Sequence, residues 1–287
     1  MVTREEKNKK IRKKINREKN INYSRNLVKI FLLIGFMFVT IFLTIRYMGT
    51  SFIKTKEFII KDSNIPISFH GKKILHFSDL LYGSTISTND LNKLEEEFQR
   101  IKPDIVVFTG DILSENYTLS KEELEEIKTF FKNIPYTIGK YSVKGDFDLT
   151  TFDLIMNEAN FTILDNENEL IYFDDNTPIS LIGFNSNNVN LDKINKEEIN
   201  KFYKISLIHN YDYYDQSFYS NIVLAGHNLN GEIYIPYYQG ILGNSKYNES
   251  YYEINNSKVF ISNGLGSVHR LRMFNHPSVN VYRLMNY

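Results

Sequence analysis

The chain has 287 residues, no cysteine and a formal net charge of zero. This length allows one sizeable domain with a buried core, or two small ones. A neutral chain has no overall field that would attract nucleic acid, and a chain without cysteine cannot rely on disulfides for stability. We therefore predict no nucleic-acid partner.

The first 26 residues depart from this neutrality. Residues 1–26 contain ten lysines and arginines but only three acidic residues, Glu5, Glu6 and Glu18. Basic segments that flank a membrane helix stay on the cytoplasmic side. We interpret residues 1–26 as a basic cytoplasmic arm.

An apolar segment follows the arm. Residues 30–45 contain no charged side chain, and the apolar stretch covers residues 27–48 when Lys29 and Arg46 extend toward lipid headgroups. About twenty such residues are enough to cross a bilayer as a helix. A buried core helix fits less well, because no polar face recurs at the helical period.

A cleaved signal peptide is the other interpretation of this segment. It fits less well because no small-residue cleavage pattern follows Tyr47 and the basic region is long. We predict an uncleaved single-pass anchor in the cell membrane at residues 27–48. Residues 49–70 are then a linker and first strand region, and residues 71–287 form an extracytoplasmic domain. The membrane is thus the first predicted partner, and proximity to it favours a lipid, an envelope polymer or a protein as a second.

Strand-like and helix-like segments alternate beyond the anchor, which favours an α/β fold. Ser120 and Glu123 form a capping-box pattern at the start of one helix. From Phe161 onward the pattern is mostly that of strands. The earlier predicted elements are, in chain order, a strand at Lys73–Asp79, a helix at Thr88–Ile101 capped by Thr88 or Asn89, a strand at Asp104–Thr109, a helix at Leu119–Phe131, a strand at Tyr141–Lys144 and a helix at Thr151–Asn160.

Polar residues follow several of the predicted strands, at the carboxyl ends where open α/β sheets bind ligands. The blocks read FSDLLYG, FTGDIL, VKGDFD, LIHNYD and LAGHNLNG. Each polar residue alone is typical of a turn or a cap. Together their carboxylates and imidazoles indicate a metal site. The candidate ligands are Asp79, Asp111, Asp146, His209 and His227.

In order and spacing, these blocks resemble those of the calcineurin-like metallophosphoesterases, which read DxH, GDxx, GNHD, an isolated H and GHxH. The segment Asn263–Val279 is similar to the C-terminal region of the membrane-anchored bacterial branch. The resemblance covers residues 71–284 and implies a four-layer α/β/β/α sandwich of two mixed sheets. It also implies two divalent cations, bridged by Asp111, that promote hydrolysis of phosphoric esters.

This chain lacks two of the ligands that bind the first metal in the family. The resemblance assigns it Asp79, Asp111 and two positions that hold Leu81 and Leu229 here. Two carboxylates alone offer only oxygen ligands, which suit weakly bound magnesium or calcium. We expect the site for this metal to be absent.

The second metal keeps a full set of ligands. The resemblance assigns it Asp111, Asp146 in place of the family asparagine, His209 and His227. Two carboxylates and two imidazoles suit one divalent ion of zinc, manganese or iron.

The catalytic histidine of the family, which helps to protonate the leaving group, falls at Phe147. Asp148, which orients that histidine in the family, is retained without its partner. No residue is therefore assigned as catalytic.

The net charge of the metal site also affects which substrates it can bind. A family site with two dications and two aspartates sums to about +2, whereas one dication with three aspartates sums to about −1. The second balance opposes an anionic substrate. The resemblance places Arg270 and Arg272 where the family often has an arginine near the site, so both are candidate substrate-binding residues.

Two hypotheses of different classes follow. In the first, the chain is a membrane-anchored pseudoenzyme, a binding or scaffold domain with at most one metal. In the second, it is an active mononuclear phosphoesterase that acts on an envelope or lipid substrate. The losses at Leu81, Phe147 and Leu229 favour the first, and the complete second ligand set keeps the other open.

Overall fold

The computed structural model describes residues 4–174, 177–229, 231–235, 239–241 and 246–287. The chain divides into two compact units, Met1–Arg46 and Tyr47–Tyr287. Each unit is described separately below.

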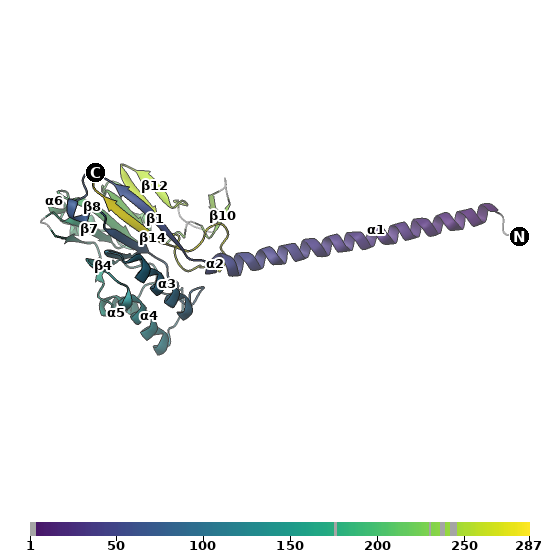
Figure 1. Ribbon diagram of the computed structural model, residues 1–287, viewed down its shortest axis with the longest axis horizontal. Helices are drawn as coiled ribbons and strands as arrows, with labels where there is room; N and C mark the ends of the chain where they lie inside the picture. The colour runs from purple at the N-terminus through teal and green to yellow at the C-terminus, as the bar shows by residue number, and fades with distance from the viewer. Residues whose placement is uncertain (1–3, 175–176, 230, 236–238, 242–245) are drawn as a thin grey trace. The chain divides into compact units, whose positions relative to one another are not determined.

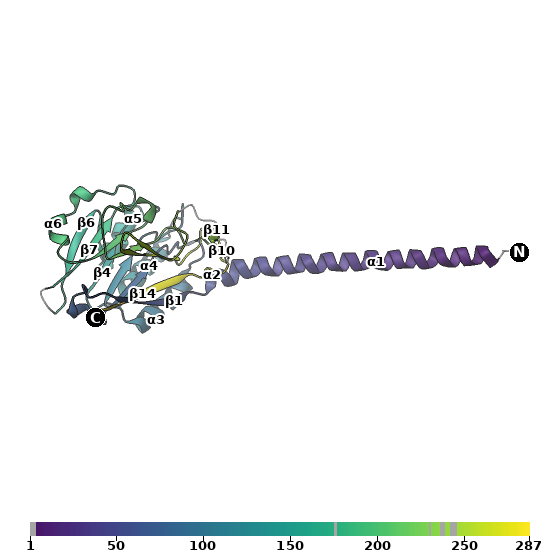
Figure 2. The same cartoon turned by 90° about the horizontal axis from the view of Figure 1, so that it is seen from above.

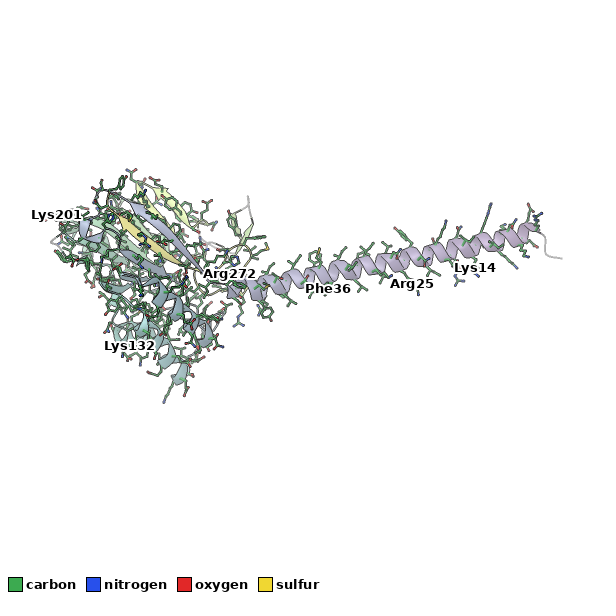
Figure 3. The ribbon with its side chains drawn as sticks, in the orientation of Figure 1. Lys14, Arg25, Phe36, Lys132, Lys201 and Arg272 are labelled. Atoms are coloured by element: carbon green, nitrogen blue, oxygen red, sulfur yellow. The ribbon has the colours of Figure 1, made fainter. Side chains whose placement is uncertain are left out.

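The first unit is helical. Helix α1 (Arg4–Leu43) has no buried residue, and its side chains, among them Lys14, Arg25 and Phe36, project from the helix in Figure 3. A π-helical turn, η1 (Thr44–Met48), and the short α2 (Gly49–Ser51) continue it into the second unit. By length and composition, this continuous helix is a candidate membrane span near the N-terminus, a description that also fits a signal sequence. The predicted basic arm and apolar segment lie on one helix.

The second unit contains two six-stranded mixed sheets. In the first sheet, the pairing of β14 with β2 is antiparallel and the other pairings are parallel. In the second, the two edge pairings are antiparallel and the inner ones parallel. The first sheet has the order β1 (Lys54–Lys61), β14 (Ser278–Met285), β2 (Lys73–Phe77), β3 (Ile105–Phe108), β4 (Gly139–Ser142), β5 (Thr162–Ile163). The second has the order β12 (Tyr251–Ile254), β13 (Ser257–Ile261), β9 (Ile222–Ala225), β8 (Tyr203–Ile208), β7 (Ile179–Phe184), β6 (Glu167–Ile171).

Three helices cover the outer face of the first sheet. They are α3 (Thr88–Ile101), α4 (Lys121–Asn133) and α5 (Thr150–Glu158), grouped on one side of the domain in Figure 1. Phe98 of α3 packs against Phe77 of β2 at a ring distance of 5.1 Å. Burying each such ring stabilises the fold by about 2–3 kcal/mol.

A second core lies between the sheets, where Val107 and Tyr141 of the first sheet join Leu207 and Leu224 of the second. A third core covers the outer face of the second sheet. Only short helices lie over it: η3 (Leu191–Lys193), α6 (Lys196–Ile199) and η4 (Tyr211–Tyr213). The predicted four-layer α/β/β/α sandwich is confirmed, with a thin fourth layer.

Helix starts follow local capping chemistry. The capping box of α4 is present, because the Glu123 N–H donates to the Ser120 hydroxyl at 3.2 Å and the Ser120 N–H donates back to Glu123 at 2.9 Å. The cap predicted for α3 is wrong by one residue. Ser87, not Thr88 or Asn89, is its N-cap, and the Ser87 N–H donates to the Asp90 carboxylate at 3.1 Å.

The sheet registers bring the candidate ligands to one edge. Phe77, Phe108 and Ser142, the last residues of β2, β3 and β4, are aligned across the first sheet. Ile208 and Ala225, at the ends of β8 and β9, are aligned across the second. Because all five strands point the same way within their sheets, the loops that follow them meet at their carboxyl ends.

Candidate metal centre

Several residues in the loops after the strands have a left-handed backbone conformation. Asp79, Asp111 and His227 have positive φ angles of 49°, 61° and 64°. Aspartate and histidine adopt this left-handed region more readily than most residues. Hydrogen bonds between loops support it, since the Asp79 N–H donates to the Gly110 carbonyl at 2.8 Å. The backbone therefore fixes the candidate ligands before any ion binds.

His209 is fully buried and oriented by a backbone group. Its Nδ1 lies 2.6 Å from the Thr109 carbonyl oxygen, so Nδ1 carries the proton and donates it there. Its Nε2 lies 3.2 Å from Oδ2 of Asp111 and has no hydrogen-bond partner. A metal-binding histidine is oriented in this way, with one nitrogen held by a backbone acceptor and the other free to bind the ion.

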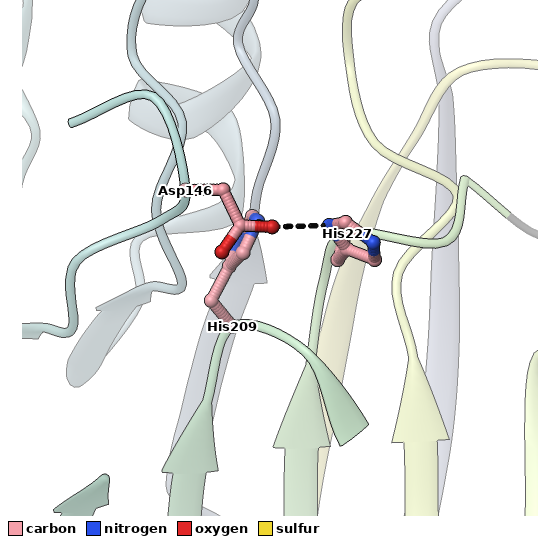
Figure 4. Close-up of side chains that lie close together, drawn as sticks. All are labelled: Asp146, His209 and His227. Atoms are coloured by element: carbon pink, nitrogen blue, oxygen red, sulfur yellow. Dashed lines mark ion pairs between the residues drawn. The ribbon is translucent and has the colours of Figure 1, made fainter. Parts of the chain in front are cut away.

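Asp146 lies between the two histidines, as Figure 4 shows. Its Oδ2 is 2.9 Å from Nδ1 of His227 and 3.9 Å from Nε2 of His209. The hydrogen bond from His227 lowers the pKa of Asp146, and the charges of both histidines act in the same direction. Burial alone would lower the pKa of His209, but Asp111, Asp79 and Asp146 raise it well above its usual value. The charged carboxylates and the protonated imidazoles therefore stabilise one another.

Two overlapping groups of side chains are close enough to hold an ion. Candidate ligand atoms of Asp146, His209 and His227 lie within 4.8 Å of one another, and so do those of Asp79, Asp111 and His209. His209 belongs to both groups. Each group combines imidazole nitrogen with carboxylate oxygen, a donor set that could hold a metal ion.

Asp79 is buried, and other protein groups already use one of its oxygens. Its Oδ2 accepts hydrogen bonds from the Ser78 hydroxyl and, at 3.1 Å, from the His227 N–H. Burial raises the pKa of Asp79, while the charge of His209 opposes the shift. Asp79 thus connects the first loop to the His227 loop as well as facing the candidate site.

Leu81 and Leu229 stand at the two positions where the family resemblance implies further ligands of the first metal. Both are buried, at 1% and 4% exposure, and both have positive φ angles, 44° and 51°. They lie against one loop, because a Cβ added at Gly266 would meet Leu81 and one at Gly264 would meet Leu229. A leucine in this conformation costs about 1–2 kcal/mol. The loops therefore keep a ligand-like backbone around aliphatic side chains.

Phe147 lines two small cavities. One has a volume of about 190 Å³ and lies toward α5, and the other has about 260 Å³ and is also lined by Leu81 and Arg270. The Phe147 N–H donates to Oδ1 of Asp111 at 2.8 Å, so its backbone supports the site while its ring offers no proton.

Asp148 has hydrogen-bond partners other than the histidine that it orients in the family. Its carboxylate accepts backbone N–H groups from Asp111 at 2.7 Å, Gly145 at 2.8 Å and Ile112 at 2.9 Å. Burial, with a contribution from Asp111, raises its pKa to about 7. In this chain Asp148 joins the second and third loops, a role that needs no histidine.

The two arginines predicted to bind substrate lie in different environments. Arg270 is exposed, lines the 260 Å³ cavity and donates to the Gly83 carbonyl at 3.2 Å. Arg272 is only 1% exposed, and its guanidinium donates to the carbonyl oxygens of Asn263 and Gly266. The substrate-binding interpretation of Arg272 does not fit this placement, because the side chain is buried and its two terminal nitrogens donate to loop carbonyls inside the protein.

We expect Arg272→Ala to lower the free energy of unfolding by about 3–5 kcal/mol, since it leaves buried carbonyl groups without donors. Arg270→Ala, at an exposed position, should change it by less than about 0.5 kcal/mol. Chemical denaturation of the full chain in detergent, followed by circular dichroism, measures both. Equal stability of the two variants would contradict the structural role of Arg272.

Three contacts at the site have no signal in the sequence. They are the Thr109 carbonyl that orients His209, the Ser78 hydroxyl on Asp79, and the pair of His269 with Glu232. Nδ1 of His269 lies 2.5 Å from Oε2 of Glu232, a residue with 1% exposure. Backbone acceptors and buried partners distant in sequence leave no local pattern.

The geometry agrees with the comparisons to known proteins. The family model described as calcineurin-like phosphoesterase matches residues 72–264. The chain is 25% identical over 253 residues to the uncharacterized metallophosphoesterase YkuE of Bacillus subtilis, covering 83% of this chain and 88% of that protein. It is 29% identical over 92 residues to the UDP-2,3-diacylglucosamine pyrophosphatase LpxG of Chlamydia trachomatis, covering 31% of this chain and 27% of that protein. The chain belongs to the calcineurin-like phosphoesterase family.

Proposed function

We propose that this chain is a membrane-anchored phosphoesterase-fold protein that binds one divalent metal and serves as a binding or scaffold domain, with hydrolysis impaired. The observation that carries the proposal is the burial of Leu81 and Leu229 at the two positions where the first metal needs ligands. An aliphatic side chain offers no lone pair, so only one ion has a complete set of donors.

The single ion would be held by Asp111, Asp146, His209 and His227, with Asp79 adjacent. When bound, a divalent ion polarises a phosphoryl oxygen and stabilises its developing charge. The side chain of Phe147 cannot donate a proton to a leaving group, and Asp148 is engaged with backbone N–H groups. The contributions that the family draws from its first metal and from its catalytic histidine are therefore missing.

An active mononuclear phosphoesterase is the second candidate. It is favoured by two overlapping groups of candidate ligands, Asp146 with His209 and His227, and Asp79 with Asp111 and His209. A substrate would be a phosphoester of a lipid or an envelope polymer. This class is suggested by the candidate membrane span and by the partial similarity to a protein named as a UDP-2,3-diacylglucosamine pyrophosphatase.

We propose that residues 27–48 form an uncleaved anchor, with the N-terminus in the cytoplasm and the residues from Thr50 onward outside. Ten lysines and arginines within residues 1–26 support this orientation through the positive-inside rule. Protease added to intact cells should then digest the large domain. A protected domain would contradict the orientation without bearing on the metal site.

Elemental analysis of the full-length chain in detergent, combined with hydrolysis of bis(p-nitrophenyl) phosphate, tests the function. We expect about one equivalent of zinc, manganese or iron per chain and no turnover above a heat-denatured control. Turnover that disappears in His227→Ala would overturn the pseudoenzyme in favour of the mononuclear enzyme. Protein without metal after dialysis against each ion would overturn both.

A further inference from the structure

One surface of the domain exposes apolar side chains from two chain segments. Phe52 follows α2 directly and is 58% exposed, while Val268 and Phe274 in the loop before β14 are 53% and 71% exposed. Phe274 also has a positive φ of 58°, which is unfavourable for a bulky residue. Soluble surfaces seldom hold large aromatic rings in strained, exposed positions without a partner. We call residues 47–52 and 268–274 the juxtamembrane surface.

The two segments lie against each other. A Cβ added at Gly49 would lie 1.9 Å from the Arg272 carbonyl oxygen, so only glycine lets the two backbones approach so closely. The Lys54 N–H donates to the Pro277 carbonyl at 2.8 Å. Figures 1 and 2 both place β10 (Ile233–Ile235), which bridges to Met273, beside α2. Phe274 thus lies two residues after Arg272, whose backbone contacts Gly49 near the end of the candidate span.

Cationic groups gather beside this surface. Burial lowers the pKa of Lys56 to about 8, and the charges of Lys54 and Arg272 act in the same direction. Burial also lowers the pKa of His276, which the same three cations lower further. Among the described residues, no carboxylate forms an ion pair with Lys54 or Lys56. Two lysines without an ion-paired carboxylate in the described part of the chain, Lys54 and Lys56, suit an anionic surface.

We propose that the juxtamembrane surface docks onto the surface of a lipid bilayer with anionic headgroups, with Phe274, Val268 and Phe52 entering the interface and Lys54 and Lys56 facing lipid phosphates. The proposal rests on the membrane anchor in the proposed function. Chain continuity supports it, because the candidate span runs to Ser51 and Phe52 is the next residue. Exposed aromatic and basic side chains next to a span are typical of interfacial contacts.

Docking in this way has a consequence for the candidate site. Val268 and Arg270 of the juxtamembrane surface also line the 260 Å³ cavity, together with Leu81 and Phe147. That cavity therefore borders the surface in contact with lipid. Its charged lining residues are Arg270 and Glu115, and Arg270 is the group that would contact the phosphate of a membrane lipid presented at the bilayer surface.

Site-directed fluorescence in proteoliposomes tests the docking. The chain has no cysteine, so Phe274→Cys provides a single labelling site in the full-length protein. Ile67→Cys is the matched control, because Ile67 is 68% exposed and follows the far end of β1. The strand rise puts the two ends of β1 about 23 Å apart. In vesicles of phosphatidylcholine and phosphatidylglycerol, a doxyl-labelled lipid should quench an NBD label at position 274 several times more strongly than one at position 67.

Charge reversal and extraction complete the test. Lys54→Glu with Lys56→Glu should reduce the quenching at position 274 in anionic vesicles. Equal quenching at positions 274 and 67, in protein that resists alkaline carbonate extraction, would overturn the docking and leave the anchor intact. Extraction of the protein by carbonate would instead overturn the anchor, and the docking with it.

Discussion

His227→Ala is expected to lower the affinity of the full-length chain for its divalent metal by about 100-fold or more. Even a residue that only supports a metal ligand typically contributes 10–100-fold to affinity, so loss of a ligand should have at least that effect. His227 is the best ligand to remove because its side chain is 31% exposed. His209 is fully buried, so its removal would also leave the Thr109 carbonyl without a donor.

The measurement is elemental analysis after equilibrium dialysis against zinc or manganese at several concentrations. His70→Ala is the control, because His70 is exposed and bonds only the Asn286 carbonyl among the described residues. Circular dichroism of both variants shows that the fold is kept. Equal metal content in His227→Ala, His70→Ala and the unaltered chain would remove the basis for an ion on Asp111, Asp146, His209 and His227.

Local patterns predicted much of this fold. The helix at Thr88–Ile101 is found with the predicted bounds, and the capping box at Ser120 is present. These features depend on neighbouring residues, such as apolar side chains at helical spacing and a hydroxyl three residues before a glutamate. The positions of Asp79 and His227 at strand ends were predictable for the same reason. Asp79 and His227 lie close together because their strands run parallel within each sheet. That arrangement was implied by the family resemblance and could not be established from residue spacing alone.

Contacts between distant loops were not predictable. Arg270 and Arg272 are the same residue type only two positions apart, yet Arg272 is buried among loop carbonyls and Arg270 is exposed. Their environments depend on where the loop at Gly264–Gly266 packs. The left-handed backbone at Leu81 and Leu229 likewise has no local signal, since leucine rarely adopts it. The backbone N–H groups that bind Asp148 leave no local pattern either, since those of Asp111 and Ile112 lie 37 and 36 residues earlier.

Restoring the three missing family residues is expected to produce a phosphodiesterase. Leu81→His and Leu229→His together should raise the bound metal from about one to about two equivalents per chain. The backbone at both positions is already left-handed, which histidine tolerates better than leucine. Each buried imidazole costs about 1–3 kcal/mol while no ion is bound, and the bound ion offsets this cost.

Adding Phe147→His should then raise hydrolysis of bis(p-nitrophenyl) phosphate by a further factor of about 10²–10⁴, the usual contribution of a positioned proton donor. The matched control carries glutamine at the same three positions, which keeps polarity and approximate size but removes the imidazole ligands. It should bind one equivalent and remain inactive. A triple histidine variant that binds two equivalents without turnover would show that another difference, such as Asp146 in place of the family asparagine, also blocks the chemistry. A variant that folds but binds only one equivalent of metal would contradict this prediction. It would show that the Gly264–Gly266 loop, which packs on Leu81 and Leu229, leaves no room for the first metal.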